Sequence, residues 1–342
     1  MTENDGLRIG VVLPGREAVV TGGDYPRRIA ALAARAEGMG YDSVWAGESP
    51  LARCRFDPLL LLAAAAARTE RIALGTAVVL GVQHQPVRLA HATACLDQLA
   101  GGRLLLGLGI GFTSAACEAE FAALGVPYQG RVQRSVELIE ACRLLWQSHG
   151  EPVNYEGAHV RLRDVAMEVA PHTKGGPPLW LAGAAAPALR RVGSLADGWF
   201  PTATGAQSYA EGWRAVESSR SRAGRPEGSV TPAMYVTVAL GKDRPAAEAD
   251  LECFVRGYYR QDLASIRRTQ GVFGGTPEQV AGQLLRYADA GARHFALRLA
   301  TPDLLPSSYE RALTEVARRL VPLLRQGTPA PEPGGAQPCP HR

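Results

Sequence analysis

Short apolar runs alternate with longer amphipathic stretches along the first 125 residues of the chain. The first of these runs, residues 7–13, is apolar on both faces and rich in Val, Ile and Leu, as is typical of a strand buried in a parallel sheet. The apolar runs cover residues 7–13, 41–47, 71–80 and 103–110. The amphipathic stretches predict helices at 24–40, 56–69 and 86–102. One strand and one helix recur about every 30 residues, which predicts a parallel sheet with helices packed outside it.

Four further apolar runs follow in the second half of the chain, at 178–184, 196–202, 231–240 and 292–300. Eight strand candidates with helical spacers favour an α/β fold of the (β/α)8 TIM-barrel type over an open sheet, and we assign residues 1–326 to this one domain. Residues 125–176 break the rhythm and predict an insertion of a helix and a small hairpin. Residues 253–275 predict a lid or an extra helix. The Pro/Gly-rich tail, 327–342, is predicted to be disordered.

Charge and cysteine usage narrow the classes of function. The formal net charge is +4 with no Lys/Arg block, which argues against a nucleic-acid partner. The apolar run at 56–69 is too short to cross a membrane, and the N-terminus lacks the pattern of a secretion signal. The cysteines form no CxxC pair and no His-x-His pair occurs, so neither a metal site nor a disulfide framework is indicated. These features predict a cytoplasmic protein.

Three glycines, Gly107, Gly109 and Gly111, alternate with apolar residues at the end of the fourth predicted strand. A dinucleotide-binding turn needs the spacing G-x-G-x-x-G, so the spacing G-x-G-x-G argues against that site. In a barrel, the C-terminal ends of the strands form the floor of the active site. Bare backbone at this place would allow a flat ligand to lie against the strand. The alternative is that the glycines serve only close packing between strands.

Several segments together resemble the bacterial luciferase-like superfamily of flavin- and F420-dependent oxidoreductases. They are "ERIALGTAVV" at 70–79, "QPVRLAHATACLDQLAGGRLLLGLGIGF" at 85–112 and "PPLWLAGAAAPALRRVGSLADGWFP" at 177–201. The likeness covers about residues 7–325. It implies a (β/α)8 barrel with an insertion, and it implies reduced FMN or coenzyme F420 bound at the C-terminal ends of the strands.

The resemblance also implies residues that contact the cofactor. Thr76, Ala77 and Val78 match a strand bulge that lies behind the flavin ring in F420-using members, where the bond Ala77–Val78 would be cis. The backbone of Gly183, Ala184 and Ala185 matches a helix start whose N–H groups face the cofactor phosphate. Alanine stands here where many relatives have serine, so the hydroxyl contact is lost and the backbone donors remain. From the residues alone, a buried strand and an ordinary helix start are the alternatives.

Candidate catalytic residues follow from the same resemblance. Many relatives carry an acid–histidine pair after the second strand, and this chain has Glu48 followed by Ser49. His84, after the third strand, is a further candidate that could titrate near neutral pH. Solvated loop positions are the alternative for Glu48 and His84. Arg88, Arg256 and Arg260 are candidates to hold the oligoglutamate tail of F420; Arg256, Tyr258, Tyr259 and Arg260 otherwise belong to a solvated helix face.

The resemblance therefore implies an enzyme. The first interpretation is a monooxygenase that uses reduced FMN and O2 on a small organic substrate, with a separate flavin reductase supplying the cofactor and a homodimeric assembly. The second is an F420-dependent hydride-transfer oxidoreductase. A flavin-binding barrel without turnover is the rival from another class.

Overall fold

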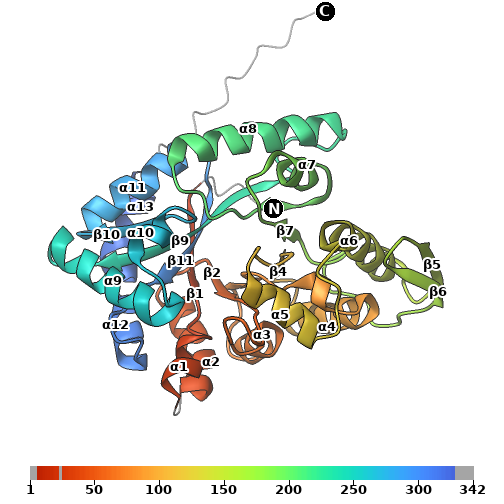
Figure 1. Cartoon of the computed structure of the whole chain (residues 1–342), viewed down its shortest axis with the longest axis horizontal. Helices are drawn as coiled ribbons and strands as arrows, with labels where there is room; N and C mark the ends of the chain where they lie inside the picture. Colours follow the sequence, from red (N-terminus) through yellow and green to blue (C-terminus); the bar gives the residue numbers. More distant parts are fainter. Residues whose placement is uncertain (1–5, 23–24, 328–342) are drawn as a thin grey trace, which may run out of the picture.

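The computed structural model describes residues 6–22 and 25–327, and the predicted tail beyond Gly327 lies outside them. Eight parallel strands close into a barrel in the order β1, β2, β3, β4, β7, β8, β9, β11 and back to β1 (Figure 1). They are β1 (Arg8–Val12), β2 (Ser43–Ala46), β3 (Ala73–Thr76), β4 (Leu104–Leu108), β7 (Leu179–Leu181), β8 (Gly198–Trp199), β9 (Thr231–Leu240) and β11 (His294–Leu299). The predicted (β/α)8 barrel is confirmed.

Helices cover the outside of the barrel and run back from the end of one strand to the start of the next (Figure 1). They are α2 (Tyr25–Gly38), α3 (Pro58–Ala66), α4 (Pro86–Leu99), α6 (Arg131–Gln147), α7 (Ala186–Leu195), α8 (Ala206–Arg222) and α11 (Pro277–Asp289). The C-terminal helices are α12 (Pro306–Glu315) and α13 (Val321–Gln326), joined by a π-helical turn, and the short α1 (Glu17–Thr21) follows β1. Their starts have local causes: the Asp57 side chain accepts from Leu60 N, and Thr276 forms a capping box with Gln279.

The observed strands are shorter than most of the predicted runs because the runs continue into loops at the C-terminal end of the barrel. The run 71–80 is the clearest case. β3 ends at Thr76, the peptide bond Ala77–Val78 is cis, and Val79 rejoins the sheet through a bridge to Leu108. The apolar character of residues 77–80 therefore belongs to the strand-end bulge rather than to a continuous strand.

Residues 125–176, where the sequence predicts a helix and a small hairpin, contain α6 and the antiparallel strands β5 (Val153–Glu156) and β6 (Arg161–Val165). The hairpin lies at the periphery, beyond α6 (Figure 1). The buried carboxylate of Glu137 on α6 holds the hairpin turn, since it accepts from the backbone N–H groups of His159 at 2.6 Å and Val160 at 2.9 Å. These hydrogen bonds lower the pKa of Glu137 even though burial alone would raise it.

The segment 253–275 is an integral part of the fold. It contains the end of α9 (Arg244–Tyr259), the extra helix α10 (Leu263–Arg267) and a ninth strand, β10 (Val272–Gly275), which pairs in parallel with β9. Tyr258 and Tyr259 are buried in a cluster of apolar side chains from α9, α10 and β10. Their assignment to a solvated helix face was wrong, because the tyrosines lie on the face of α9 that packs against the strands.

Large and small side chains alternate to fill the interior of the barrel. Trp45 packs against Trp180 and Phe200, with ring centroids 5.1 and 4.7 Å away. A Cβ atom at Gly75 would collide with the Trp45 ring, and one at Gly198 would lie 2.6 Å from the Trp180 ring. Glycines on neighbouring strands thus leave the room that the indole rings occupy, as in other packed barrels.

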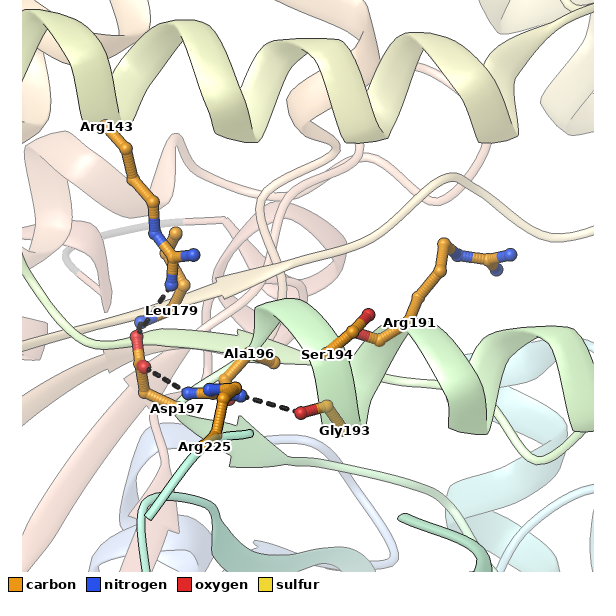
Figure 2. A network of polar contacts seen from close by, with 8 residues as sticks. All are labelled: Arg143, Leu179, Arg191, Gly193, Ser194, Ala196, Asp197 and Arg225. Atoms are coloured by element: carbon orange, nitrogen blue, oxygen red, sulfur yellow. Dashed lines mark hydrogen bonds and ion pairs between the residues drawn. The ribbon is translucent and has the colours of Figure 1, made fainter. Parts of the chain in front are cut away.

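A polar network, shown in Figure 2, ties strands and helices together at the start of β8. The glycine-rich strand ends lie at the other, C-terminal, ends of the parallel strands. Asp197, directly before β8, accepts from Leu179 N at 2.9 Å and from the Arg143 side chain at 3.3 Å. Arg225 donates to the other carboxylate oxygen of Asp197 at 3.1 Å and to the carbonyl of Gly193 at 2.9 Å. The network therefore connects α6, β7, the end of α7 and the segment before β9.

Within the described residues, no helix is both long and apolar enough to cross a lipid bilayer.

Candidate active site

The C-terminal ends of β2, β3 and β4 are joined around the bond Ala77–Val78. Ala77 N donates to the Ala46 carbonyl at 2.7 Å, and the Val78 carbonyl accepts from Glu48 N at 3.0 Å. On the other side, Val79 N donates to the Gly107 carbonyl at 2.9 Å, and Gly109 N donates to the Val79 carbonyl at 2.8 Å. The cis bond that the resemblance implies is present, in a bulge that is hydrogen-bonded to both neighbouring strands.

The glycines of β4 face this bulge closely. A Cβ atom at Gly107 would collide with the Thr76 carbonyl oxygen, and one at Gly109 would lie 2.6 Å from the Val78 side chain. Gly111 has a φ of +79°, a conformation that glycine adopts without strain. Close packing against the β3 segment therefore requires glycine at 107 and 109, and the left-handed backbone and the approach of Cys117 favour it at 111. The same absence of side chains leaves bare backbone at the strand end.

Glu48 and His84 form an ion pair at the edge of the bulge. His84 Nε2 lies 2.8 Å from Glu48 Oε1, and Leu80 N donates to Glu48 Oε2 at 2.6 Å. Burial would lower the pKa of His84, but the hydrogen bond and the negative charge of Glu48 outweigh it and raise the pKa above its usual value. The His84 side chain is 28% exposed and that of Glu48 is 11% exposed, so the pair is mostly buried but still reaches solvent. The structure brings these two predicted residues together.

Ser49 lies beside them but its hydroxyl group is engaged elsewhere. It donates to Glu120 Oε2 at 2.9 Å and accepts from Arg53 N at 2.9 Å. The same Glu120 oxygen accepts from Leu51 N and Ala52 N, at 2.8 and 2.7 Å. Ser49 thus fixes the loop after β2 to α5 (Ala115–Ala123), and the structure gives it a positioning task.

The start of α7 follows the end of β7, the strand next to β4 in the barrel. Ala185 is the N-cap and no side chain caps the helix. Among the described residues, the backbone N–H groups of Gly183, Ala184 and Ala185 have no hydrogen-bond acceptor. A helix N-terminus with free N–H groups attracts an anion. The register pairs Leu108 with Leu181, so Gly109 and this helix start lie at adjacent strand ends.

The three arginines considered for an F420 tail are all exposed, on separate elements. Arg88 lies in the first turn of α4, Arg256 pairs with Glu252 on α9 at 2.9 Å, and Arg260 ends α9 in a left-handed conformation. A surface cleft of about 590 Å³ between α9, β10 and α11 contains none of the candidate residues.

Sequence reasoning missed a second polar group at the mouth. Arg298 on β11 pairs with Glu17 on α1 at 2.9 Å, and each side chain is only 3% exposed. Arg298 also donates to the hydroxyl group of Tyr235 on β9, and its guanidinium group lies 4.6 Å from the centroid of the Tyr258 ring. A charged residue inside the otherwise apolar run "HFALRLA" was the available signal, because buried charges are rare without a partner.

Comparison with known proteins identifies the class. The profile of the family described as luciferase-like monooxygenase matches residues 7–294, and the chain belongs to this family. It is thus an enzyme of the oxidoreductase class. Among the described residues, no group of three or more His, Cys, Asp or Glu side chains is placed to hold a metal ion.

Two curated relatives show the range of the family. The phthiodiolone/phenolphthiodiolone dimycocerosates ketoreductase of Mycobacterium tuberculosis is 29% identical over 289 residues, which cover 72% of this chain and 74% of the relative. The F420-dependent glucose-6-phosphate dehydrogenase of Kineococcus radiotolerans is 28% identical over 334 residues, covering 88% and 94%.

Two solved structures share the fold. The monooxygenase RslO1 of Streptomyces bottropensis superposes with a TM-score of 0.79 at 24% identity, over 92% of this chain and 99% of that one. The oxygenating constituent of 3,6-diketocamphane monooxygenase of Pseudomonas putida, a type II Baeyer–Villiger monooxygenase in complex with FMN, superposes with a TM-score of 0.72 at 19% identity, over 93% and 98%.

Proposed function

We propose that this enzyme binds reduced FMN at the C-terminal ends of its barrel strands and uses O2 to oxygenate a small organic substrate. The observation that carries the proposal is the start of α7, where free backbone N–H groups of Gly183, Ala184 and Ala185 lie at the strand end next to Gly109. This arrangement suits a ligand with a phosphate group and a flat ring.

The residues present fit FMN at this place. The free N–H groups and the positive end of the α7 dipole would hold the phosphate. Alanine at 184 and 185 offers no hydroxyl group, so backbone donors carry the whole contact. Thr76, Ala77 and Val78 would form the wall behind the ring, and Gly109 and Gly111 leave room for it to lie against the end of β4.

The chain's own groups would position, shield and exchange a proton. Reduced FMN, when bound, supplies the chemistry that activates oxygen. The apolar wall would exclude water from the reacting atoms. Glu48 and His84 would hold a proton at the mouth, shared between His84 Nε2 and Glu48 Oε1, and Ser49 would keep their loop in place through Glu120.

The alternative cofactor is F420, which is named for the relative from Kineococcus radiotolerans. Hydride transfer would then replace oxygen chemistry, and the exposed arginines at 88, 256 and 260 would meet the oligoglutamate tail. With FMN as the cofactor, we also propose that a separate flavin reductase supplies it in reduced form. We propose further that the enzyme is a homodimer and works in the cytoplasm. A barrel that binds flavin without turnover would instead hold it tightly and form no product.

Titration of the purified protein with FMN and with F420, followed by fluorescence, tests the choice of cofactor. We expect FMN to bind more tightly and an oxygenated product to form only when the enzyme, reduced FMN, O2 and a substrate are all present. Preferential binding of F420 would replace the FMN proposal by the F420 alternative. Binding of neither cofactor would contradict both.

The phosphate contact has its own test. Ala184→Asp places a carboxylate beside the free N–H groups and should weaken FMN binding at least tenfold by repulsion of the phosphate. Riboflavin, which lacks the phosphate, should bind the wild type and the variant with similar affinity. Ala249→Asp, at an exposed position on α9, is the matched control and should bind FMN like the wild type. Equal loss of FMN and riboflavin binding would show that the substitution does not act through the phosphate, and would contradict a phosphate site at the start of α7.

A further inference from the structure

Three arginines gather on the other side of the barrel mouth, after β1 and β2. We call Arg16, Arg53 and Arg55 the arginine cluster. β1 and β2 are paired neighbours, so the loops that follow them leave the barrel side by side. Arg16 is 9% exposed, and Arg53 and Arg55 are half-buried. The cluster is thus shielded from bulk water and open to the mouth.

The partners of the arginine cluster are all neutral. Arg16 donates to the Tyr258 carbonyl at 2.8 Å, and Arg55 donates to the Glu48 carbonyl at 3.0 Å. Arg53 lies against two rings, 5.3 Å from the centroid of Tyr259 and 5.6 Å from that of Phe112. In the described part of the chain, none of the three forms an ion pair with a carboxylate, unlike Arg298 with Glu17.

Two carboxylates close to the cluster along the chain pair with other groups. Glu17 Oε1 pairs with Arg298, while its Oε2 is buried without a hydrogen-bond partner among the described residues. Glu48 pairs with His84 and accepts from Leu80 N. Burial lowers the pKa of Arg16; the neighbouring Tyr258 raises it, and the charges of Arg55, Arg260 and Arg53 lower it further. Shielded cations without a counter-ion are costly, whereas an arginine–carboxylate contact is strong and directional. The mouth therefore holds an excess of positive charge that an anionic group would offset.

Aromatic rings border the same place. Phe112, in the loop that follows β4, is 71% exposed. The ring of Tyr259 from α9 also lies near Arg53, with its centroid 5.3 Å from the guanidinium group. An exposed ring next to guanidinium groups suits a ligand that has both a flat apolar body and a negative charge.

We propose that the arginine cluster binds the carboxylate of an anionic substrate whose flat apolar body lies against Phe112. This inference rests on the proposed function, because it names the substrate class of the same active site. Guanidinium groups bind any anion, so the arginine cluster could hold either the carboxylate of the substrate or the phosphate of the cofactor. The start of α7 and the arginine cluster lie on opposite sides of the mouth, so the two anions can be distinguished.

Benzoate and its neutral analogue benzamide are suitable probes. Calorimetric titration of the full-length protein, with and without bound FMN, should show benzoate binding at least tenfold tighter than benzamide. Arg55→Gln and Arg53→Gln should each reduce benzoate affinity several-fold, and the double variant should bind the two probes equally. Arg27→Gln, an exposed arginine on α2, is the control and should bind benzoate like the wild type.

The arms of the experiment keep the two proposals apart. Loss of FMN affinity with unchanged riboflavin affinity in the double variant would assign the cluster to the cofactor phosphate and overturn the inference. Equal binding of benzoate and benzamide to the wild type would also overturn it. Benzoate binding that depends on Arg53 and Arg55 in a protein that binds no flavin would support the anion site while contradicting the proposed function. Circular dichroism confirms that the variants are folded.

Discussion

At the scale of single residues, the contact between Glu48 and His84 is one that the sequence alone does not reveal. The two positions are 36 residues apart, and the sequence offered each of them only as a separate candidate. The bulge after β3 brings the loop of His84 against the end of β2, where the 2.8 Å contact forms. The pairing was unpredictable because it depends on the path of residues 77–83 over the barrel rim.

The charge of His84 gives a pH prediction. Its folded pKa is raised above the unfolded value of about 6.5, so the pair contributes stability that is fully present below that value and lost as the pH rises through the folded pKa. Nuclear magnetic resonance titration should find the His84 pKa above its usual value in the wild type. In Glu48→Gln the pKa should fall below that value, because burial then acts without the carboxylate. An unchanged pKa in the variant would contradict the pairing.

The same scale explains why the arginine cluster and its neighbours escaped sequence analysis. Arg16 contacts Tyr258 across 242 positions, and Arg298 contacts Glu17 across 281. No local pattern links residues so far apart. The one local signal was the charge of Arg298 inside an otherwise apolar run, and it would not have revealed the partner Glu17.

At the scale of elements, the alternation of buried runs and amphipathic stretches was sufficient to predict eight barrel strands, and the break in this alternation at 125–176 indicated the insertion. β10 was missed because its sequence, "VFGG", carries two glycines and resembles a turn. It is a strand because it lies beside the long β9, whose last residues offer an unpaired edge on that side. Tertiary contact, rather than local propensity, decides such a short strand.

The hairpin of the insertion depends on one buried carboxylate, and this gives a prediction for an element. Glu137→Gln should destabilise the fold by about 2 kcal/mol, because the amide cannot replace the charged acceptor for the backbone N–H groups of the turn. Urea denaturation measures the loss, and hydrogen exchange should become faster at 157–160. Glu151→Gln, at an exposed position before β5, should change the stability little. Equal effects of the two variants would contradict the role of Glu137.

At the scale of the whole molecule, the closed barrel separates its two ends. Its interior is filled by indole rings and by the buried His294, whose Nε2 lies 2.7 Å from the Ser43 hydroxyl group. The sequence predicted the barrel but not which side chains fill its interior. Whether a strand residue points inward depends on the register of the strands and on how the barrel closes. Burial lowers the pKa of His294 to about 3, so the ring is neutral whenever the protein is folded near neutral pH.

This buried histidine predicts sensitivity to acid. The unfolded chain takes up a proton on His294 near pH 6.5 and the folded protein does so only near pH 3, so stability falls as the pH decreases between these values. The slope from this residue is about 1.4 kcal/mol per pH unit. Thermal denaturation between pH 7 and pH 4.5 should therefore show a smaller loss of stability in His294→Asn than in the wild type. Parallel curves for the two proteins would contradict the buried neutral histidine.

The polar network around Asp197 has a consequence for how this protein can change. It joins α6, β7, the end of α7 and the approach to β9 at the base of the cylinder, while every residue assigned to cofactor or substrate lies at the opposite rim. Rim loops can thus acquire new specificities through substitution without loosening the closure of the base. Laboratory evolution that randomises the rim while preserving Asp197, Arg143 and Arg225 would explore new substrates on an unaltered framework.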